Sequence, residues 1–204
     1  MTLLWIAIWL ALSVFIIGIF IWTTRALQEQ KAVWKKFAAG RQLEFTAGHF
    51  FQSASLRGAV NGYDLLITSE QRGAADLRGR KFVTLFQFGL PDRLPAPAVI
   101  GSGDYRAFVD SMPAADSLQL DFPGWTPETV LAKTDDRVRV LPYFTPERLR
   151  VLDSLIKQKN ASVLFLFDER NAYLRLETTD PMLKPGQLDK VIDSVIPLLK
   201  ALAP

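Results

Sequence analysis

The chain begins with an apolar run of 20 residues, Leu3 to Trp22, that contains no charged side chain. An α-helix rises about 1.5 Å per residue, so a run of this length spans the roughly 30 Å hydrocarbon layer of a bilayer. No basic residue precedes the run and no small-x-small cleavage site follows it, which disfavours a cleaved signal peptide. We therefore predict an uncleaved transmembrane anchor in residues 1–23, in contact with membrane lipid through residues 3–22.

After the anchor, the apolar positions recur with the spacing of an amphipathic helix. This pattern predicts a juxtamembrane helical stalk in residues 24–41, with Gly40 as its C-cap. The residues expected on the apolar face of the stalk are Leu27, Trp34, Phe37 and Ala38.

Basic side chains lie on only one side of the anchor. None precedes it, and those that follow within about 20 positions are Arg25, Lys31, Lys35, Lys36 and Arg41. The positive-inside rule therefore places the N terminus outside and the C-terminal domain in the cytoplasm, on a cell (inner) membrane crossed once.

Beyond the stalk, shorter apolar runs predict antiparallel hairpins. Asn61-Gly62 suits the positive φ angles of a tight turn between strands at 55–60 and 63–69. A second hairpin joins strands at 162–167 and 172–178. Further strands are expected at 43–46, 81–88, 99–100, 118–122 and 137–141.

Two amphipathic helices are predicted toward the C terminus. The first covers 146–159 with Thr145 as its N-cap, and the second covers 188–202. A shorter helix is expected at 104–111. Hairpins mixed with segregated helices indicate an α+β fold, and the length suits one hydrophobic core. We therefore predict one soluble α+β domain in residues 42–204.

The composition excludes several kinds of chemistry. The chain has no cysteine, which rules out disulfides, thiol nucleophiles and Cys-ligated metals, and it has a single histidine. Its formal net charge of +3 is too small to indicate a nucleic-acid partner. We expect no cofactor.

The candidate catalytic residues are few. His49 is the only histidine, so any dyad would use it, although a structural role in a loop is the simpler interpretation. Asp135-Asp136 and Asp168-Glu169 are adjacent acidic pairs. Neighbouring side chains on extended backbone point to opposite faces, so neither pair forms an acid/base couple by itself, and turns explain both pairs.

Two short motifs resemble functional ones. The glycine-rich segment 101–104 precedes an expected helix but lacks the lysine and the length of a phosphate-binding loop. Ser154 and Lys157 have the S-x-x-K spacing of some acyl-transfer enzymes, but the companion S-D-N and K-T-G elements are absent. We assign no catalytic, cofactor-binding or metal-ligating residue.

Basic residues of the stalk and of the loop after residue 70 are the remaining candidates for a site. They would meet anionic headgroups or an acidic partner if the domain lies close to the membrane, and otherwise they are solvated. These candidate contact residues are Lys31, Lys35, Lys36, Arg72, Arg78, Arg80 and Lys81.

The segment from Asp135 to Glu177 combines an expected strand, a helix that begins Thr-Pro and a hairpin whose last strand contains Tyr-Leu. This order resembles a family of membrane-anchored bacterial proteins of unknown function. The resemblance implies a bacterial cell membrane and a cytoplasmic α+β domain, and it transfers no catalytic residue. The matching positions are Thr145-Pro146, Leu152, Phe167-Asp168 and Tyr173-Leu174.

Three functions remain open after these exclusions. The favoured hypothesis is a membrane-tethered, non-enzymatic interaction or assembly domain whose partner is another membrane-associated protein. One alternative is a small membrane-bound hydrolase or lipid-modifying enzyme that uses His49. The other is a domain that senses anionic lipid or ligand through the basic residues between Arg72 and Lys81.

Overall fold

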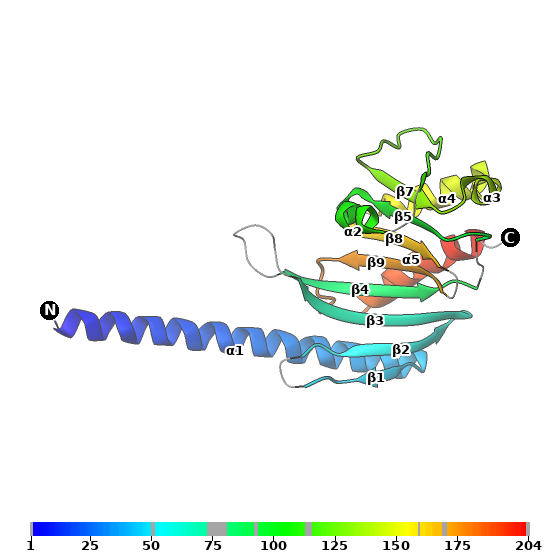
Figure 1. The fold of residues 1–204 in the computed structure, drawn as a ribbon. Coiled ribbons are helices and arrows are strands. Elements are labelled where there is room, and N and C mark those ends of the chain that lie inside the picture. The colour runs from blue at the N-terminus through cyan, green and yellow to red at the C-terminus, as the bar shows by residue number, and fades with distance from the viewer. Residues whose placement is uncertain are drawn as a thin grey trace.

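A long helix leads into a domain built on one antiparallel sheet, which confirms the predicted α+β class (Figure 1). The computed structural model describes residues 2–49, 52–72, 81–91, 94–112, 116–158, 160–168 and 171–202, of which 2, 3, 71, 72, 81 and 82 are described by backbone alone.

The first helix, α1 (Thr2–Arg41), runs without a break through the residues predicted as anchor and stalk. Its apolar first half makes no contact with the domain, and its side chains are exposed from Leu4 to Thr23. By length and composition α1 can cross a membrane, and no other helix in the described part of the chain can. The second half of the same helix packs against the domain.

The C-terminal end of α1 lies one residue beyond the predicted cap. Gly40 is still helical, and Gln42 instead adopts the left-handed conformation with φ 56°. The N–H of Leu43 donates to the carbonyl of Ala38 at 2.9 Å, which is the six-to-one bond of a Schellman motif. The chain therefore reverses direction at Gln42 and enters the sheet.

Nine strands of the described chain form one sheet in the order β1-β2-β3-β4-β9-β8-β5-β7-β6, with all neighbours antiparallel. Asn61 and Gly62, with φ 52° and 86°, make the predicted turn between β2 and β3. The bounds are β1 Glu44–Thr46, β2 Ser55–Val60, β3 Tyr63–Arg72, β4 Lys81–Gly89, β5 Ala98–Ser102, β6 Asp116–Ser117, β7 Val130–Thr134, β8 Ala161–Phe167 and β9 Ala172–Thr178.

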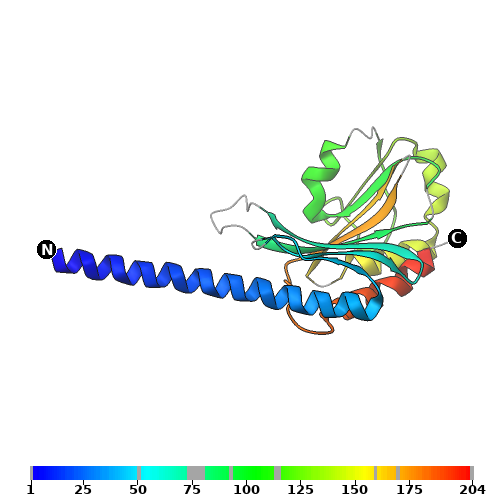
Figure 2. The same ribbon diagram turned by 90° about the horizontal axis from the view of Figure 1, so that it is seen from below.

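The shorter helices divide between the two faces of the sheet. The face that carries Phe86, Phe165 and Leu174 packs against α1, α4 and α5 and forms the main core, whereas α2 packs on the opposite face. Figure 2 shows α1 and α5 running along the same side of the domain. The bounds are η1 Gly103–Tyr105, α2 Arg106–Ser111, α3 Arg137–Val140, η2 Leu141–Tyr143, α4 Pro146–Ile156 and α5 Gln187–Leu202.

Trp34 fixes α1 to the domain. Its side chain has no exposed surface, and its indole N–H donates to the carbonyl of Met182 at 3.3 Å. One helical turn earlier, the buried Gln30 amide donates to the carbonyl of Pro181 at 2.7 Å. The segment that connects β9 to α5 is therefore bonded to the stalk.

Arg41 makes a second connection, between the end of α1 and the start of α5. Its Nη2 lies 2.7 Å from the Asp189 carboxylate and 3.2 Å from the Asp193 carboxylate. The hydrogen bond with Asp189 raises the pKa of Arg41 further, against the lowering effect of burial, so the guanidinium stays charged. The two helices are thus connected by packing and by charge.

Two predicted strands are wrong. Residues 137–141 form α3 and the start of η2, because the Asp136 side chain accepts the N–H of Arg139 at 3.1 Å and caps a helix. Residues 118–122 are irregular, although the N–H of Leu118 continues the sheet pairing by donating to Ala132. The strands in this region are β6 and β7, at positions where the sequence pattern predicts none.

The predicted helix at 146–159 is confirmed but ends earlier, at Ile156. Its predicted cap is present, since the Thr145 hydroxyl accepts the N–H of Arg148 at 3.4 Å. Pro146 occupies the first helical position, where its missing N–H costs nothing.

Trp34→Ala is expected to lower the free energy of unfolding of the domain by about 3–5 kcal/mol, because it removes a fully buried indole and leaves a cavity. Thermal unfolding followed by near-ultraviolet circular dichroism in detergent micelles measures this change. Trp22→Ala is the matched control, since the Trp22 side chain is 71% exposed and should leave the transition unchanged. Equal transitions for Trp34→Ala and wild type would show that the stalk is not part of the core.

A double-mutant cycle of Arg41→Ala and Asp189→Ala should give a coupling free energy of about 0.5–1 kcal/mol, since both partners are partly exposed and screened by water. Chemical denaturation in micelles at low and at high salt measures the coupling, which is expected to shrink as salt rises. A coupling that is zero at low salt would contradict an ion pair between α1 and α5.

Candidate interaction surface

His49 lies on the connection between β1 and β2 and is exposed. Its contact with the rest of the domain is through its backbone, since Lys31 Nζ donates to the His49 carbonyl at 2.8 Å. In the described part of the chain the imidazole makes no hydrogen bond. Among the described residues, no acidic or nucleophilic side chain is hydrogen-bonded to the His49 imidazole.

The acidic pairs have local structural roles. Asp136 caps α3, and Asp168 accepts the N–H of Asn171 at 2.5 Å in the turn between β8 and β9. Glu169 lies outside the described residues. The structure places Asp168 at the end of β8, bonded to the residue before β9, and replaces the turn predicted at the first pair with a helix cap at Asp136.

The two motif-like segments are also explained by structure. Ser154 Oγ donates to the carbonyl of Arg150 at 2.9 Å, and Lys157 Nζ pairs with Asp153 at 2.9 Å, so Ser154 and Lys157 do not bond each other. In the glycine-rich segment, Ser102 belongs to β5 and its Oγ accepts the N–H of Val163 at 3.1 Å. Neither segment supplies a reactive group.

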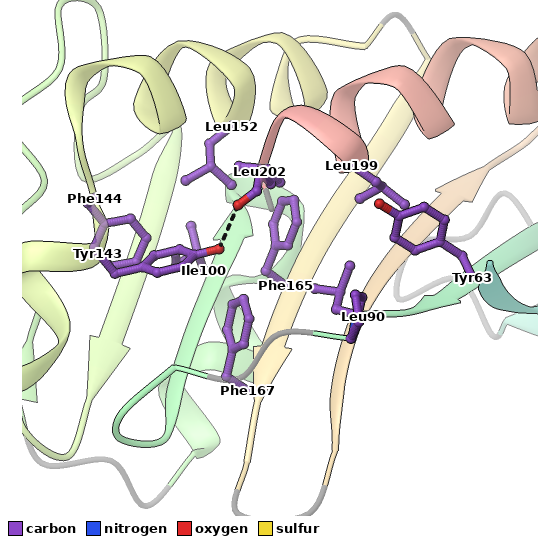
Figure 3. Close-up of a pocket in the computed structure, with 11 residues that line it drawn as sticks. Tyr63, Leu90, Ile100, Tyr143, Phe144, Leu152, Phe165, Phe167, Leu199 and Leu202 are labelled. Atoms are coloured by element: carbon purple, nitrogen blue, oxygen red, sulfur yellow. Dashed lines mark hydrogen bonds between the residues drawn. The ribbon is translucent and has the colours of Figure 1, made fainter. Parts of the chain in front are cut away.

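An aromatic cavity lies between the sheet and the two C-terminal helices (Figure 3). Its volume is ≈ 20 Å³, enough for about one water molecule. Phe165 and Phe167 from β8 and Leu199 from α5 line it, and the Tyr143 hydroxyl donates to the carbonyl of Leu202 at 3.3 Å. This cavity is an imperfection in core packing.

Among the described residues no group of three or more His, Asp or Glu side chains is placed to hold a metal ion.

The three predicted stalk lysines have different environments. Lys31 is half-buried and bonded to the β1–β2 connection, whereas Lys35 and Lys36 are exposed. Within the described residues neither Lys35 nor Lys36 forms an ion pair. Lys31 therefore holds the domain to the stalk, and the other two lysines are available to solvent or to a ligand.

Lys36 lines an open groove of ≈ 480 Å³ between α1 and α5, which we call the stalk groove. Its apolar part comes from Val33 and Phe37 of the stalk and Leu188 of α5, and Arg41 closes one end through its ion pair with α5. A groove with an apolar floor and a free cation at its border suits a partner segment that carries apolar and acidic side chains. The stalk groove is lined by Ala32, Val33, Lys36, Phe37, Gly40, Arg41, Pro185, Gly186, Leu188 and Asp189.

The stalk groove continues a smooth face of the membrane half of α1. Gly18 and Lys36 are 18 positions apart, which is about five helical turns, so both lie on one side of the helix. Ala11 and Ala32 flank this line at helical spacing. A Cβ added at Gly18 or Gly40 would meet no atom within 4 Å. This side of α1 is therefore open along most of its length.

The predicted basic loop is only partly described. Arg78 and Arg80 lie outside the described residues, as do the other residues from 73 to 80. The backbones of Arg72 and Lys81 are directly opposite each other at the ends of β3 and β4. In Figures 1 and 2 these strand ends point in the same direction as the N-terminal half of α1. The structure does not bring this end of the sheet to the stalk groove.

Lys36 was predicted from the sequence as a candidate contact residue, which stays a prediction, and the second wall of its groove was not predicted. Leu188 and Asp189 were predicted only as the beginning of an amphipathic helix, and they are separated from the stalk by about 150 positions. A local pattern carries no information about which helix faces which. One sequence signal pointed to a distant contact of the stalk. Arg41 ends α1, and the last turn of that helix contains no acidic residue that could pair with it.

Comparison with known protein families finds no match, and comparison with curated protein sequences finds none either. The resemblance to membrane-anchored bacterial proteins of unknown function therefore stays a prediction. Among solved structures, the chain is similar to the crystal structure of the mycobacterial trehalose monomycolate transport factor A, TtfA, with a TM-score of 0.49 and 8% sequence identity. The alignment covers 86% of this chain and 97% of that one. A likeness this distant assigns no function to the chain.

Proposed function

We propose that this chain is a membrane-tethered, non-enzymatic interaction domain that binds another membrane-associated protein in the stalk groove. The observation that carries the proposal is the continuity of α1, which is one helix from its exposed apolar half to the fully buried Trp34. A domain held in this way keeps a fixed position relative to its anchor. Such a position is useful for assembling a second protein at the membrane.

The height of the stalk groove above the membrane follows from the helix. Lys36 lies 14 positions beyond Trp22, at the end of the apolar run, which is about 21 Å along α1. A partner with its own membrane helix can run along the open side of α1 and reach this level with its juxtamembrane segment. Small side chains such as Ala11 and Gly18 allow helices to approach closely in lipid.

The chemistry of the groove selects the partner segment. Val33, Phe37 and Leu188 offer apolar surface, which favours an amphipathic helix that buries its apolar face there. Lys36 favours an acidic residue at the border of that helix, while Arg41 is already engaged by Asp189. The proposed partner is therefore a membrane protein with an amphipathic, acidic juxtamembrane segment.

The side of the membrane is part of this proposal. The basic residues that follow the apolar run, including Lys35 and Lys36, favour a cytoplasmic domain on a bacterial inner membrane. The hydrolase alternative needs His49, and the geometry around His49 offers no observation in its favour.

Ala32→Phe tests the groove, because Ala32 is exposed and a phenyl ring there would fill the space between α1 and α5 without entering the core. A photo-crosslinking residue at Lys36 in native membranes should give one adduct of defined mass with a second protein. Ala32→Phe should reduce the yield of this adduct about tenfold or more, equivalent to about 1.4 kcal/mol of binding free energy.

Ala39→Phe is the matched control, since Ala39 is an exposed alanine of the same helix that does not line the groove. It should leave the adduct yield unchanged. No adduct from position 36, or equal losses for the two phenylalanine variants, would refute the stalk groove as the binding surface. An adduct made of two copies of this chain would replace the proposed partner with self-association.

A further inference from the structure

The sheet has an incompletely paired edge at β7, on the side opposite β1 (Figure 1). β6 covers only the C-terminal end of β7, because its two residues pair with Thr134 and Lys133. The pairing continues for one further bond, in which the N–H of Leu118 donates to the carbonyl of Ala132 at 2.9 Å. The chain then leaves the sheet, so in the described structure the first half of β7 has β5 on one side and no strand on the other.

Two backbone groups on this outer side of β7 lack partners. The carbonyl of Thr129 accepts the N–H of Gly103 at 3.0 Å, so its hydrogen bond is on the β5 side. The alternation of an antiparallel strand then turns the backbone groups of Val130 and Ala132 to the outer side. Among the described residues, the N–H of Ala132 and the C=O of Val130 make no hydrogen bond. This donor and this acceptor flank Leu131, which is the arrangement that a single bridge to another strand uses.

An open groove of ≈ 720 Å³ lies against the same stretch of β7, and we call it the edge groove. It is lined by α2, by β7 and by residues of the segment 117–127. Val109 of α2 offers apolar surface on one face of the sheet, and Leu120 and Trp125 offer it on the other. Successive side chains of an extended peptide point to opposite faces, so a peptide beside β7 can place apolar side chains against both surfaces.

Positive charge lies at both ends of the edge groove. Near the start of β7, Arg106 lines the groove and its Nη2 donates to the carbonyl of Pro127 at 2.8 Å. Three positions after the end of β7, Arg137 lines the groove with an exposed side chain. Within the described part of the chain Arg137 forms no ion pair. An acidic side chain near either end of a bound peptide therefore meets a guanidinium group.

The other charges of the edge groove do not cancel this preference. Lys133 Nζ lies 3.9 Å from the Asp110 carboxylate, so these two charges offset each other. Asp121 is the remaining acidic residue of the lining. Three basic and two acidic side chains line the groove, which leaves a net charge of +1.

We propose that the β7 edge binds an extended, acidic peptide segment of a partner protein, which adds to the sheet as a further strand. The backbone of the segment bonds the N–H of Ala132 and the C=O of Val130, and its apolar and acidic side chains supply the selectivity. This site lies at the opposite edge of the sheet from β1 and shares no residue with the stalk groove, so it is independent of the partner proposed there.

The test uses the full chain in phosphatidylcholine nanodiscs and a fluorescein-labelled heptapeptide, Glu-Val-Thr-Val-Thr-Val-Glu. Fluorescence polarisation measures the dissociation constant. Two control peptides carry the same side chains and two backbone N-methyl groups each, on one edge or on the other edge of the extended peptide. Methylation of the edge that faces β7 should weaken binding about tenfold, because it removes the N–H that donates to Val130, whereas methylation of the other edge should leave binding unchanged.

Two variants of the chain test the protein side. Arg137→Glu should weaken binding of the glutamate-ended peptide about fivefold. Arg150→Glu is the matched control, since Arg150 is an exposed arginine that does not line the edge groove, and it should leave binding unchanged. Ala132→Pro removes the outer N–H without removing a bond to β5, and should weaken binding about tenfold. The comparison of methylated peptides uses the wild-type chain, so it remains decisive even if this variant fails to fold.

Four results would overturn the proposal. Absence of binding by the unmethylated peptide at millimolar concentration would show that the edge does not accept a strand. Equal affinities for the two methylated peptides would show contact through side chains alone. Equal losses for Arg137→Glu and Arg150→Glu would show a general charge effect. Dimerisation of the chain itself, detected by sedimentation and abolished by Ala132→Pro, would put a second copy in the place of the peptide.

Discussion

The burial of one face of α1 in the domain is the constraint on which the rest of the structure depends. Trp34 and Ala38 lie against the sheet with at most 2% of their surface exposed, although the same helix leaves its first half without any protein contact. Burial of an indole favours docking by several kcal/mol, far more than a partly exposed ion pair such as that of Arg41 with Asp189. Apolar packing therefore fixes the helix, and charge adjusts its end.

Because apolar packing holds the helix, most charged side chains stay at the surface, and this determines which surfaces are available to ligands. The apolar groups that face the sheet are used in folding, whereas Lys36 remains outside the core. Its distance from the apolar half of α1 follows from the rise of a helix and needs no flexible linker. A chain whose anchor joined its domain by a loop would not hold this surface at a defined height.

Local signals made much of the fold predictable. Asn61-Gly62 and Thr145 act through their own turn and cap, so their elements were predicted correctly. The apolar and polar side chains of residues 137–141 alternate as they do in a strand. The segment is helical instead, because the Asp136 side chain caps α3 and the residues after it are hydrogen-bonded as a helix. The opposition of Leu188 and Asp189 to the stalk depends on contacts across the whole chain, which no local pattern specifies. Lys36 was predicted from charge alone, and its groove was not.

The wide separation in sequence of the contacts around Trp34 has a consequence for biogenesis. Its bonding partner Met182 is 148 positions away, and β4 pairs with β9 across about 90 positions of the chain. Synthesis proceeds from the N terminus, so the anchor leaves the ribosome well before the residues that cover the stalk. Until β9 and the start of α5 are made, the stalk can contact β1 and β2, but Trp34 lacks its bonding partner Met182. The nascent chain therefore carries an incomplete sheet and an incompletely covered tryptophan, and the addition of the last elements around α1 is a late folding event.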